Sequence, residues 1–468
     1  MSKIATDKAI KFIDSWLELR YNNLEIPGFT VAIQQKGKVL FEKSYGFANT
    51  AKKEKLTPRH IFRIASHSKT FTATAVMQLQ EQGKIRIDDH VADYLTWLKK
   101  HTDKRWQKVT IRQLLSHSAG VLRDGVDADY WQLERPFPDS SQLRTEVLGS
   151  KLVLENNTKM KYSNYGYSLL GLLIEVVSKI SYEEYVTQNI IKPLKLNDTG
   201  SDYTPSIEDR LVTAYSRRDY KQDRVPISKN IPTNSMAAAT GFYATARDLC
   251  AYFSAHVVGS KKLLSDESKK EMQRLQWEVE SIDDKPGRYG LGLQLDSVGK
   301  RKTLGHSGGF PGTVTVSFCD PDDELVVTVL VNSYAPVGLI AKGIMNILDY
   351  FKEHSENAAA IRKTEKFEGR FMCIWGISEF VSFGKKILDI YPDSWAPFEG
   401  ATELKVVDED TLKITKTSGY SSSGEFVKFT FTDRTATKIS HSGTTLWPEK
   451  EYLEMMKKVK VLEVPKNA

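Results

Sequence analysis

The chain has 468 residues, 40% hydrophobic and 27% charged, which is typical of a globular protein with two or three domains. Its 66 basic and 59 acidic residues leave a net charge of +7, and the basic residues form no stripe interleaved with aromatics, which argues against nucleic-acid binding. The three distant cysteines, Cys250, Cys319 and Cys373, form neither a CxxC metal site nor a disulfide framework.

The first twenty residues predict a helix rather than a targeting segment. Ile10, Ile13, Trp16 and Leu17 fall at helical spacing with charges between them, and no apolar core of signal-peptide type is present. No stretch of the sequence approaches the ~20 apolar residues of a membrane span. We therefore expect a cytoplasmic protein with no membrane partner.

The next segments predict an α+β arrangement. Residues 28–49 contain two β-rich runs broken at Lys36-Gly37-Lys38, which indicates a hairpin. A helix is expected from just after Ser66 to near Gly83, and residues 85–260 are mostly helical. Strands return at "YGLGLQL", "GTVTVSFCD" and "ELVVTVLVNS", followed by a helix from 338 to about 351.

The C-terminal part predicts a separate β-domain. Residues 356–366 are charged and poor in large apolar groups, as expected for a linker. From Phe367 onward, short alternating runs such as "TLKITKT" and "EFVKFTFTD" are separated by Gly, Asp and Ser, which favours a small barrel. We expect a first domain at 1–355, a linker at 356–366 and a β-rich domain at 367–468.

A serine and a lysine stand one turn apart at a predicted helix start. Ser66 has two interpretations: a helix-capping hydroxyl, or a nucleophile whose proton is taken by Lys69. Two other Ser-x-x-Lys copies, at 297–300 and 382–385, contain a glycine and precede no amphipathic helix. Only the first copy places the pair where the helix dipole favours a developing oxyanion.

Two further patterns carry chemistry. Tyr162-x-Asn164 lies in a polar turn ahead of a buried helix, and a tyrosine near an ammonium can have its pKa lowered enough to shuttle protons. His306-x-Gly308 precedes a strand and is followed by Gly309. Glycines there allow close approach of a substrate to the strand edge and offer the Gly309 N–H to an oxyanion.

One motif competes with this interpretation. Residues 305–309 match G-x-S-x-G, the nucleophile elbow of α/β-hydrolases, with Ser307 at its centre. That elbow needs a helix after it, whereas Pro311 and a β-branched run follow here, so Ser307 is not expected to be the nucleophile. His117 in "LLSHSAG" has no partner at ligand spacing and is interpreted as a turn residue. No metal site is predicted.

The three motifs, in this order, resemble those of the penicillin-recognising serine hydrolases, and most closely the class C β-lactamase-like branch. That branch includes D-aminopeptidases, D-alanyl carboxypeptidases, esterases and CubicO-type peptidases. "LLSHSAG" and "GHSGGFPGTVTVSF" also look like that family, so the resemblance covers roughly residues 5–350. It implies a β-lactamase/transpeptidase-like antiparallel sheet with a helical subdomain. The tail resembles the lipocalin-like domain that some members append.

The resemblance implies a covalent mechanism without metal or cofactor. Ser66 attacks a carbonyl, Lys69 and Tyr162 relay its proton to the leaving group, and water hydrolyses the acyl-enzyme. Asn164 orients the acyl chain, and His306 and Gly308 also bind the substrate. The backbone N–H groups of Ser66 and Gly309 hold the oxyanion.

The third motif departs from the family pattern, because His306 replaces the lysine of most penicillin-binding members. Histidine is mostly neutral at pH 7 and becomes an imidazolium below about pH 6. This weakens the case for a β-lactamase or D,D-carboxypeptidase. We expect peptides or amino-acid amides, including D-residues, as substrates. Two alternative functions remain open: a carboxylesterase and a non-enzymatic binding protein. Assembly into a homo-oligomer also remains open.

Overall fold

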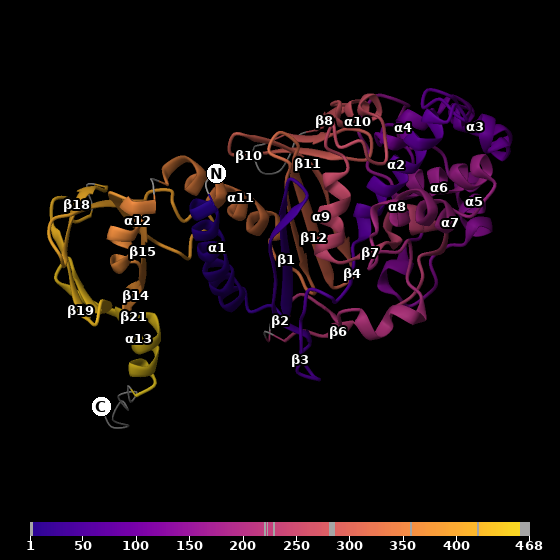
Figure 1. Ribbon diagram of the computed structural model, residues 1–468. Helices are drawn as coiled ribbons and strands as arrows, with labels where there is room; N and C mark the ends of the chain where they lie inside the picture. Colours follow the sequence, from indigo (N-terminus) through magenta and orange to yellow (C-terminus); the bar gives the residue numbers. More distant parts are fainter. Residues whose placement is uncertain are drawn as a thin grey trace, which may run out of the picture. The chain divides into compact units, whose positions relative to one another are not determined.

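The computed structural model describes residues 3–219, 221, 223–227, 230–279, 286–355, 358–418 and 421–458. The chain divides into two compact units (Figure 1). One comprises Leu24–Lys342, and the other combines Met1–Asn23 with Gly343–Ala468.

The unit Leu24–Lys342 is built on a nine-stranded antiparallel sheet with the order β3-β2-β1-β13-β12-β11-β10-β9-β8. The strands are β1 (Gly28–Gln35), β2 (Lys38–Asn49), β3 (Glu54–Lys55), β8 (Trp277–Val279), β9 (Gly287–Tyr289), β10 (Gln294–Val298), β11 (Arg301–Phe310), β12 (Thr313–Asp320) and β13 (Leu325–Val331). Two short pairs lie outside it: β4 (Phe62–Arg63) with β7 (Tyr243–Ala244), and β5 (Ala214–Tyr215) with β6 (Pro226–Ile227). Strand β13 is buried along its whole length, because this central strand is covered on both faces.

The helices of this unit pack against the sheet and one another. The α-helices are α2 (Ser68–Glu81), α3 (Val91–Tyr94), α4 (Ile111–Leu115), α5 (Ser140–Gly149), α6 (Asn164–Ser178), α7 (Tyr182–Val186), α8 (Lys192–Leu194), α9 (Ala246–Ser254) and α10 (Asp266–Gln273). Shorter turns are η1 (Ala65–His67), η2 (Thr96–Lys100), η3 (Lys104–Lys108), η4 (Asp129–Gln132), η5 (Thr187–Ile191), η6 (Pro205–Arg210), η7 (Asn234–Met236) and η8 (Ala237–Gly241). Helix α9 lies along the sheet against β1 and β13, whereas α2 and α6 contact each other in the helical region (Figure 1).

The other unit contains a closed eight-stranded barrel, β14-β15-β16-β17-β18-β19-β20-β21. Its strands are β14 (Gly369–Cys373), β15 (Gly376–Ser382), β16 (Lys386–Ile390), β17 (Thr402–Val406), β18 (Thr411–Lys416), β19 (Phe426–Thr432), β20 (Thr435–His441) and β21 (Thr444–Pro448). Its helical elements are α1 (Lys3–Leu24) up to Asn23, α11 (Val337–His354) from Gly343 onward, α12 (Ala358–Thr364), η9 (Glu365–Phe367) and α13 (Glu449–Met456). The alternating sequence therefore does close into a barrel, as expected.

The barrel interior is filled by side chains. Inward-facing residues of the strands meet Phe367 of η9, so the core consists of aromatic and aliphatic groups. The segment expected as a linker, 356–366, includes helix α12 and most of η9. The division of the chain at residue 355 stays a prediction.

Helix α1 contributes to this same unit. Phe12 packs against Phe351 and Phe398, with ring centroids 5.9 and 5.1 Å away, and Trp16 Nε1 donates to the Ser394 carbonyl at 3.1 Å. Arg20 is buried and forms an ion pair with a carboxylate of the barrel unit. The apolar face seen in the sequence thus has its partners about 380 residues away. Within the described residues, every helix is too short or too polar to cross a membrane.

Candidate active site

Ser66 lies in a tight turn between β4 and α2. The turn η1 follows Ile64, and Ala65 adopts φ = +46°, a left-handed conformation that is unusual for alanine. Among the described residues no side chain caps η1 or α2, whose N-cap is His67, so the capping interpretation of Ser66 fails. The partly exposed Ser66 Oγ instead lies 3.2 Å from Lys69 Nζ.

Neighbouring side chains fix this turn. Ser68 Oγ donates to the Ala65 carbonyl at 2.5 Å and accepts the Phe242 N–H at 3.0 Å. His67 is fully buried and contacts Ser317 Oγ through Nε2 at 3.1 Å. Burial lowers the pKa of His67 to about 3, so it is a neutral packing residue.

Lys69 is completely buried and makes three polar contacts. Its Nζ lies 2.6 Å from Asn164 Oδ1, 2.8 Å from the Ala239 carbonyl and 3.2 Å from Ser66 Oγ. Burial lowers the pKa of Lys69 well below its usual value. A neutral amine has two N–H donors, which the amide and carbonyl oxygens accept, and one lone pair, which is then available to the Ser66 hydroxyl.

Tyr162 covers Lys69. The ring centroid of Tyr162 lies 4.7 Å from Lys69 Nζ, and the Ser66 side chain acts on its phenol. Burial nevertheless raises the pKa of Tyr162, which contradicts the expected lowering. Desolvation outweighs the stabilisation of a phenolate here, so Tyr162 is a neutral hydroxyl that can pass a proton on, and the basic group is Lys69.

Asn164 begins helix α6. Ser163 caps the helix by accepting the Gly166 N–H at 2.8 Å, which directs Asn164 toward Lys69. Its amide is held at both ends, because Nδ2 donates to Asp124 Oδ1 at 2.6 Å while Oδ1 accepts from Lys69. One Nδ2 hydrogen remains for a substrate.

His306 is buried on β11 behind the site. Its Nε2 lies 3.2 Å from the Tyr289 hydroxyl and its Nδ1 lies 2.6 Å from the Ser307 carbonyl. Burial, with smaller contributions from His67 and Lys69, lowers the pKa of His306 well below 6.5. The expected imidazolium near pH 6 is therefore wrong, because the ring has no water to solvate the charge.

Gly308 and Gly309 lie at an open stretch of strand edge. Pairing of β10 with β11 ends at Gly305, and the Ser307 N–H is accepted by the Gln294 side chain at 2.9 Å. Because alternate N–H groups of a strand point the same way, the Gly309 N–H faces this same edge. A Cβ at Gly308 would lie 2.1 Å from the Ile64 carbonyl, so only glycine lets β11 approach the turn that carries Ser66.

Ser307 is not in an elbow. It lies inside β11, which continues through a turn into strand β12, and it lines a groove of about 570 Å³ together with Met160, Tyr289 and Phe318. The strand-to-helix turn required for a nucleophile elbow is therefore absent at this position of the described chain.

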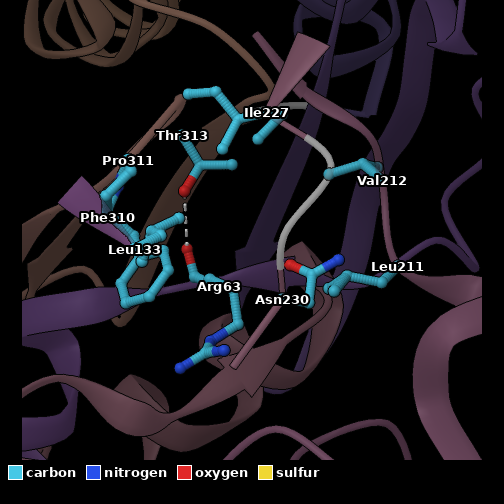
Figure 2. Close-up of a pocket in the computed structure, with 10 residues that line it drawn as sticks. Arg63, Leu133, Leu211, Val212, Ile227, Asn230, Phe310, Pro311 and Thr313 are labelled. Atoms are coloured by element: carbon cyan, nitrogen blue, oxygen red, sulfur yellow. Dashed lines mark hydrogen bonds between the residues drawn. The ribbon is translucent and has the colours of Figure 1, made fainter. Parts of the chain in front are cut away.

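The buried Arg63 directly precedes Ile64 and the turn that carries Ser66. The Arg63 guanidinium lies 4.3 Å from the Phe310 ring centroid and donates to the Ile231 carbonyl at 3.1 Å. Figure 2 shows the cavity beside it, about 10 Å³, with Thr313 Oγ1 donating to the Arg63 carbonyl at 3.2 Å. Burial lowers the pKa of Arg63 to about 10. This space holds no more than one water and is a structural feature.

Three residues of the site were not identified from the sequence. His117 accepts the Ser163 N–H at 3.1 Å, and its ring centroid lies 4.2 Å from that of Tyr162. It does occupy a turn, with φ = +60°, but its ring lines the site. Asp124 and Tyr289 contact Asn164 and His306. The motif "LLSHSAG" was a usable signal for His117, whereas a polar loop and a short strand gave none for the others.

The beta-lactamase family description matches residues 13–350. "Protein flp" of Staphylococcus aureus (strain MW2) is 30% identical over 194 residues, 42% of this chain and 39% of that protein. "Beta-lactamase-like protein 4" of Dictyostelium discoideum is 30% identical over 260 residues, 52% of this chain and 44% of that protein. The matched region thus spans less than half the length of these relatives.

Two solved structures are similar over larger fractions. The octameric penicillin-binding protein homologue from Pyrococcus abyssi has a TM-score of 0.64 and 24% identity, covering 93% of this chain and 98% of its own. A D-stereospecific amidohydrolase from Streptomyces sp. has a TM-score of 0.59 and 25% identity, covering 69% of this chain and 94% of its own. The first similarity shows the fold, with helices around an antiparallel sheet and a barrel.

Proposed function

The chain belongs to the beta-lactamase family, and we propose on that premise that it is a serine hydrolase that forms an acyl-enzyme on Ser66. The observation that carries the proposal is the buried Lys69 amine, 3.2 Å from the Ser66 hydroxyl, with its other two polar contacts on oxygen acceptors. A lysine kept neutral by burial is a competent general base at neutral pH.

In the first half-reaction the substrate carbonyl lies between Ser66 and the open edge of β11. The Ser66 oxygen attacks the carbonyl carbon while its proton passes to Lys69 Nζ. The negative charge that develops on the carbonyl oxygen is received by the backbone N–H groups of Ser66 and Gly309. Asn164 uses its remaining Nδ2 hydrogen to hold the acyl chain.

The leaving group then takes the proton. Tyr162, a neutral phenol that lies over Lys69, passes a proton to the departing amine or alcohol as the tetrahedral intermediate collapses, and it takes the proton held on Lys69 Nζ in exchange. Water enters, gives a proton to the same relay and attacks the acyl carbon. As the second tetrahedral intermediate collapses, the relay returns that proton to Ser66 Oγ and the acid product leaves.

We assign peptides or amino-acid amides, including D-residues, as the substrates. The neighbouring Streptomyces structure is a D-stereospecific amidohydrolase, which supports amide cleavage. The neutral His306 supports substrates without a free carboxylate near β11, because it supplies no positive charge there.

We also propose self-association, since the similar Pyrococcus abyssi protein is octameric. The turn between β14 and β15 exposes 80% of Ile374 and 88% of Trp375, side chains of the kind enriched at protein interfaces. Light scattering of the wild type and of Trp375→Ser tests this. A monomeric wild type contradicts it.

The catalytic proposal is tested with a fluorophosphonate, followed by a panel of matched L- and D-residue amides, activated esters and a cephalosporin. We expect one phosphonyl group on Ser66, no labelling of Ser66→Ala, and normal labelling of the control Ser307→Ala. Amides of D-residues should have the highest kcat/KM in the panel. Labelling of Ser307, or turnover by Ser66→Ala, overturns the assignment, and turnover of esters alone makes the protein an esterase.

A further inference from the structure

We propose that Asp124 is a positioning residue, which orients the Asn164 amide toward Lys69 and places a fixed negative charge beside the buried amine. The inference deepens the proposed function and rests on it, because it gives Asp124 a part in proton transfer from Ser66 to Lys69.

The contacts of Asp124 form a continuous chain to the nucleophile. Asp124 Oδ1 accepts the Asn164 Nδ2 hydrogen at 2.6 Å, Asn164 Oδ1 accepts from Lys69 Nζ at 2.6 Å, and Lys69 Nζ lies 3.2 Å from Ser66 Oγ. A carboxylate can only accept hydrogen bonds, so it forces the nitrogen of the amide toward itself. The amide oxygen therefore faces Lys69, which receives a fixed acceptor.

Asp124 is itself held in place. Its Oδ1 also accepts the Trp131 indole N–H at 3.1 Å, and its Oδ2 accepts the Arg123 Nε hydrogen at 3.0 Å. The Asp124 side chain is 14% exposed, whereas that of Arg123 is 64% exposed. The negative charge is thus the better buried of the pair, and water screens the field of Asp124 less than that of Arg123.

The charges around Lys69 come from several elements. The groups that face or act on it are Arg123 and Asp124 of the loop after α4, His117 of the same loop, Tyr162 and Tyr167 at α6, and His306 of β11. The histidines are neutral and the tyrosines are protonated, because burial lowers the pKa of the former and raises that of the latter.

The two charged neighbours therefore act on Lys69 in opposite directions. Burial is the largest effect and lowers the pKa of Lys69, Asp124 raises it, and Arg123 lowers it further. Asp124 keeps the amine basic enough to take the Ser66 proton despite its burial, since a base acts best when its pKa is near the working pH.

The test measures the rate of Ser66 phosphonylation by a fluorophosphonate from pH 5 to pH 10, which needs no knowledge of the substrate. In Asp124→Asn the acid limb of this profile should move down by about one pH unit, at the lower end of charge effects on neighbouring pKa values. In Asp124→Glu, which keeps the charge, the limb should stay within about 0.3 unit of the wild type.

Two further variants test the sign of the charge effect on the Lys69 pKa and provide a control. Arg123→Gln should move the acid limb upward, because it removes a positive charge near Lys69. Asp127→Asn removes a charge on the same loop, at an exposed carboxylate paired with Arg135, and should leave the profile unchanged.

Each outcome of these phosphonylation profiles supports or overturns a stated proposal. A uniform loss of rate in Asp124→Asn without a shift of the limb, or a profile that matches that of Asp127→Asn, overturns the proposal. If Asp124→Asn does not fold, as judged by thermal melting, an unshifted limb in Arg123→Gln overturns it instead. Absence of Ser66 labelling in the wild type would overturn the proposed function, which is a distinguishable failure.

Discussion

The space behind Ser66 and the interior of the barrel are both closed to solvent, yet their chemistry is opposite. Behind Ser66 lie the buried polar groups Lys69, His117, Asn164 and His306, each with a hydrogen-bond partner. The barrel core consists of Phe367, Phe371, Phe380, Ile387, Leu404, Leu412, Ile414, Val427, Phe429, Ile439 and Leu446. A buried polar group destabilises a fold unless it is paired. The polar region behind Ser66 therefore has the composition of a reaction site, whereas the apolar barrel interior has that of a stabilising core.

Substitution of Lys69 should have the largest effect of the changes considered for these two regions. Both Lys69→Ala and Lys69→Arg should lower kcat/KM by about 10²–10⁴-fold, because alanine removes the base and a guanidinium stays protonated and cannot accept the Ser66 proton. The control is Lys300→Arg, in the Ser-x-x-Lys copy that lies at the β10–β11 turn, which should remain active. Nearly normal kcat/KM in Lys69→Arg would mean that Lys69 acts only as a fixed charge and not as a base.

The barrel side of the comparison is tested at Phe429. Its ring centroid lies 5.0 Å from that of Phe367 and 5.4 Å from that of Phe380. Phe429→Ala should therefore destabilise the barrel unit by about 3–5 kcal/mol in denaturant titrations, while Ser66 phosphonylation is unaffected.

Phe426→Ala on the same strand is the matched control, since Phe426 is 55% exposed, and it should change stability by less than about 1 kcal/mol. If the two variants were equally stable, the interior would not be the stabilising core described above.

Two neighbouring glycines sharpen the geometry of the reaction site. A Cβ at Gly308 would collide with the Ile64 carbonyl, whereas a Cβ at Gly309 meets nothing within 4 Å. Gly308→Ala should destabilise the protein by about 1–3 kcal/mol and reduce Ser66 labelling at least tenfold, since β11 must move away from the turn. Gly309→Ala, whose Cβ meets no protein atom, should change stability by less than about 0.5 kcal/mol. Equal effects would show that β11 does not need close contact.

The last prediction concerns the pH dependence of stability. His67 and His256 have pKa values lowered to about 3 and about 4, and burial also lowers those of His117 and His306. Below about pH 6.5 the unfolded chain binds protons that the folded chain does not, so unfolding free energy should rise with pH up to about 6.5 and then level off.

The check is a set of denaturant titrations between pH 4.5 and pH 8. The slope below pH 6.5 should be smaller in His256→Gln than in the wild type, because one group no longer takes up a proton on unfolding. A slope that is the same in both proteins would mean that His256 is protonated in the fold. Burial lowers the pKa of His306 well below 6.5, so the preference between a peptide acid and its amide should not change between pH 6.5 and pH 8.

Local patterns in the sequence predicted the parts of the site that lie close along the chain. The Ser66–Lys69 spacing is one helical turn, and Tyr162 and Asn164 flank a helix cap, so periodicity and turn chemistry placed these residues at helix starts, whereas the resemblance to the family supplied their roles. Asp124 and Tyr289 could not be predicted, because their importance comes from contacts with Asn164 and His306 made only in three dimensions. The direction of the Tyr162 pKa shift and the protonation of His306 near pH 6 were predicted wrongly for a related reason, since desolvation depends on the surrounding fold.

The fold shows the same division. Alternating runs predicted the barrel strands, because each strand faces the core on one side only. The apolar stripe of α1 was visible in Ile13 and Trp16, but periodicity identifies a buried face without its partner. That partner, the segment around Ser394, is remote in the sequence and has no pattern that marks it.

The placement of α1 has a consequence for synthesis. Trp16 leaves the ribosome about 380 residues before Ser394, and at 5–20 residues per second this interval is roughly 20–75 s. Until α11 with Phe351 is synthesised, the apolar side of the helix has no native partner to cover it, while the chain from Leu24 to Lys342 is completed. The two ends of this unit are thus joined only late in translation, and the nascent chain presents an amphipathic segment for chaperones to bind in the meantime.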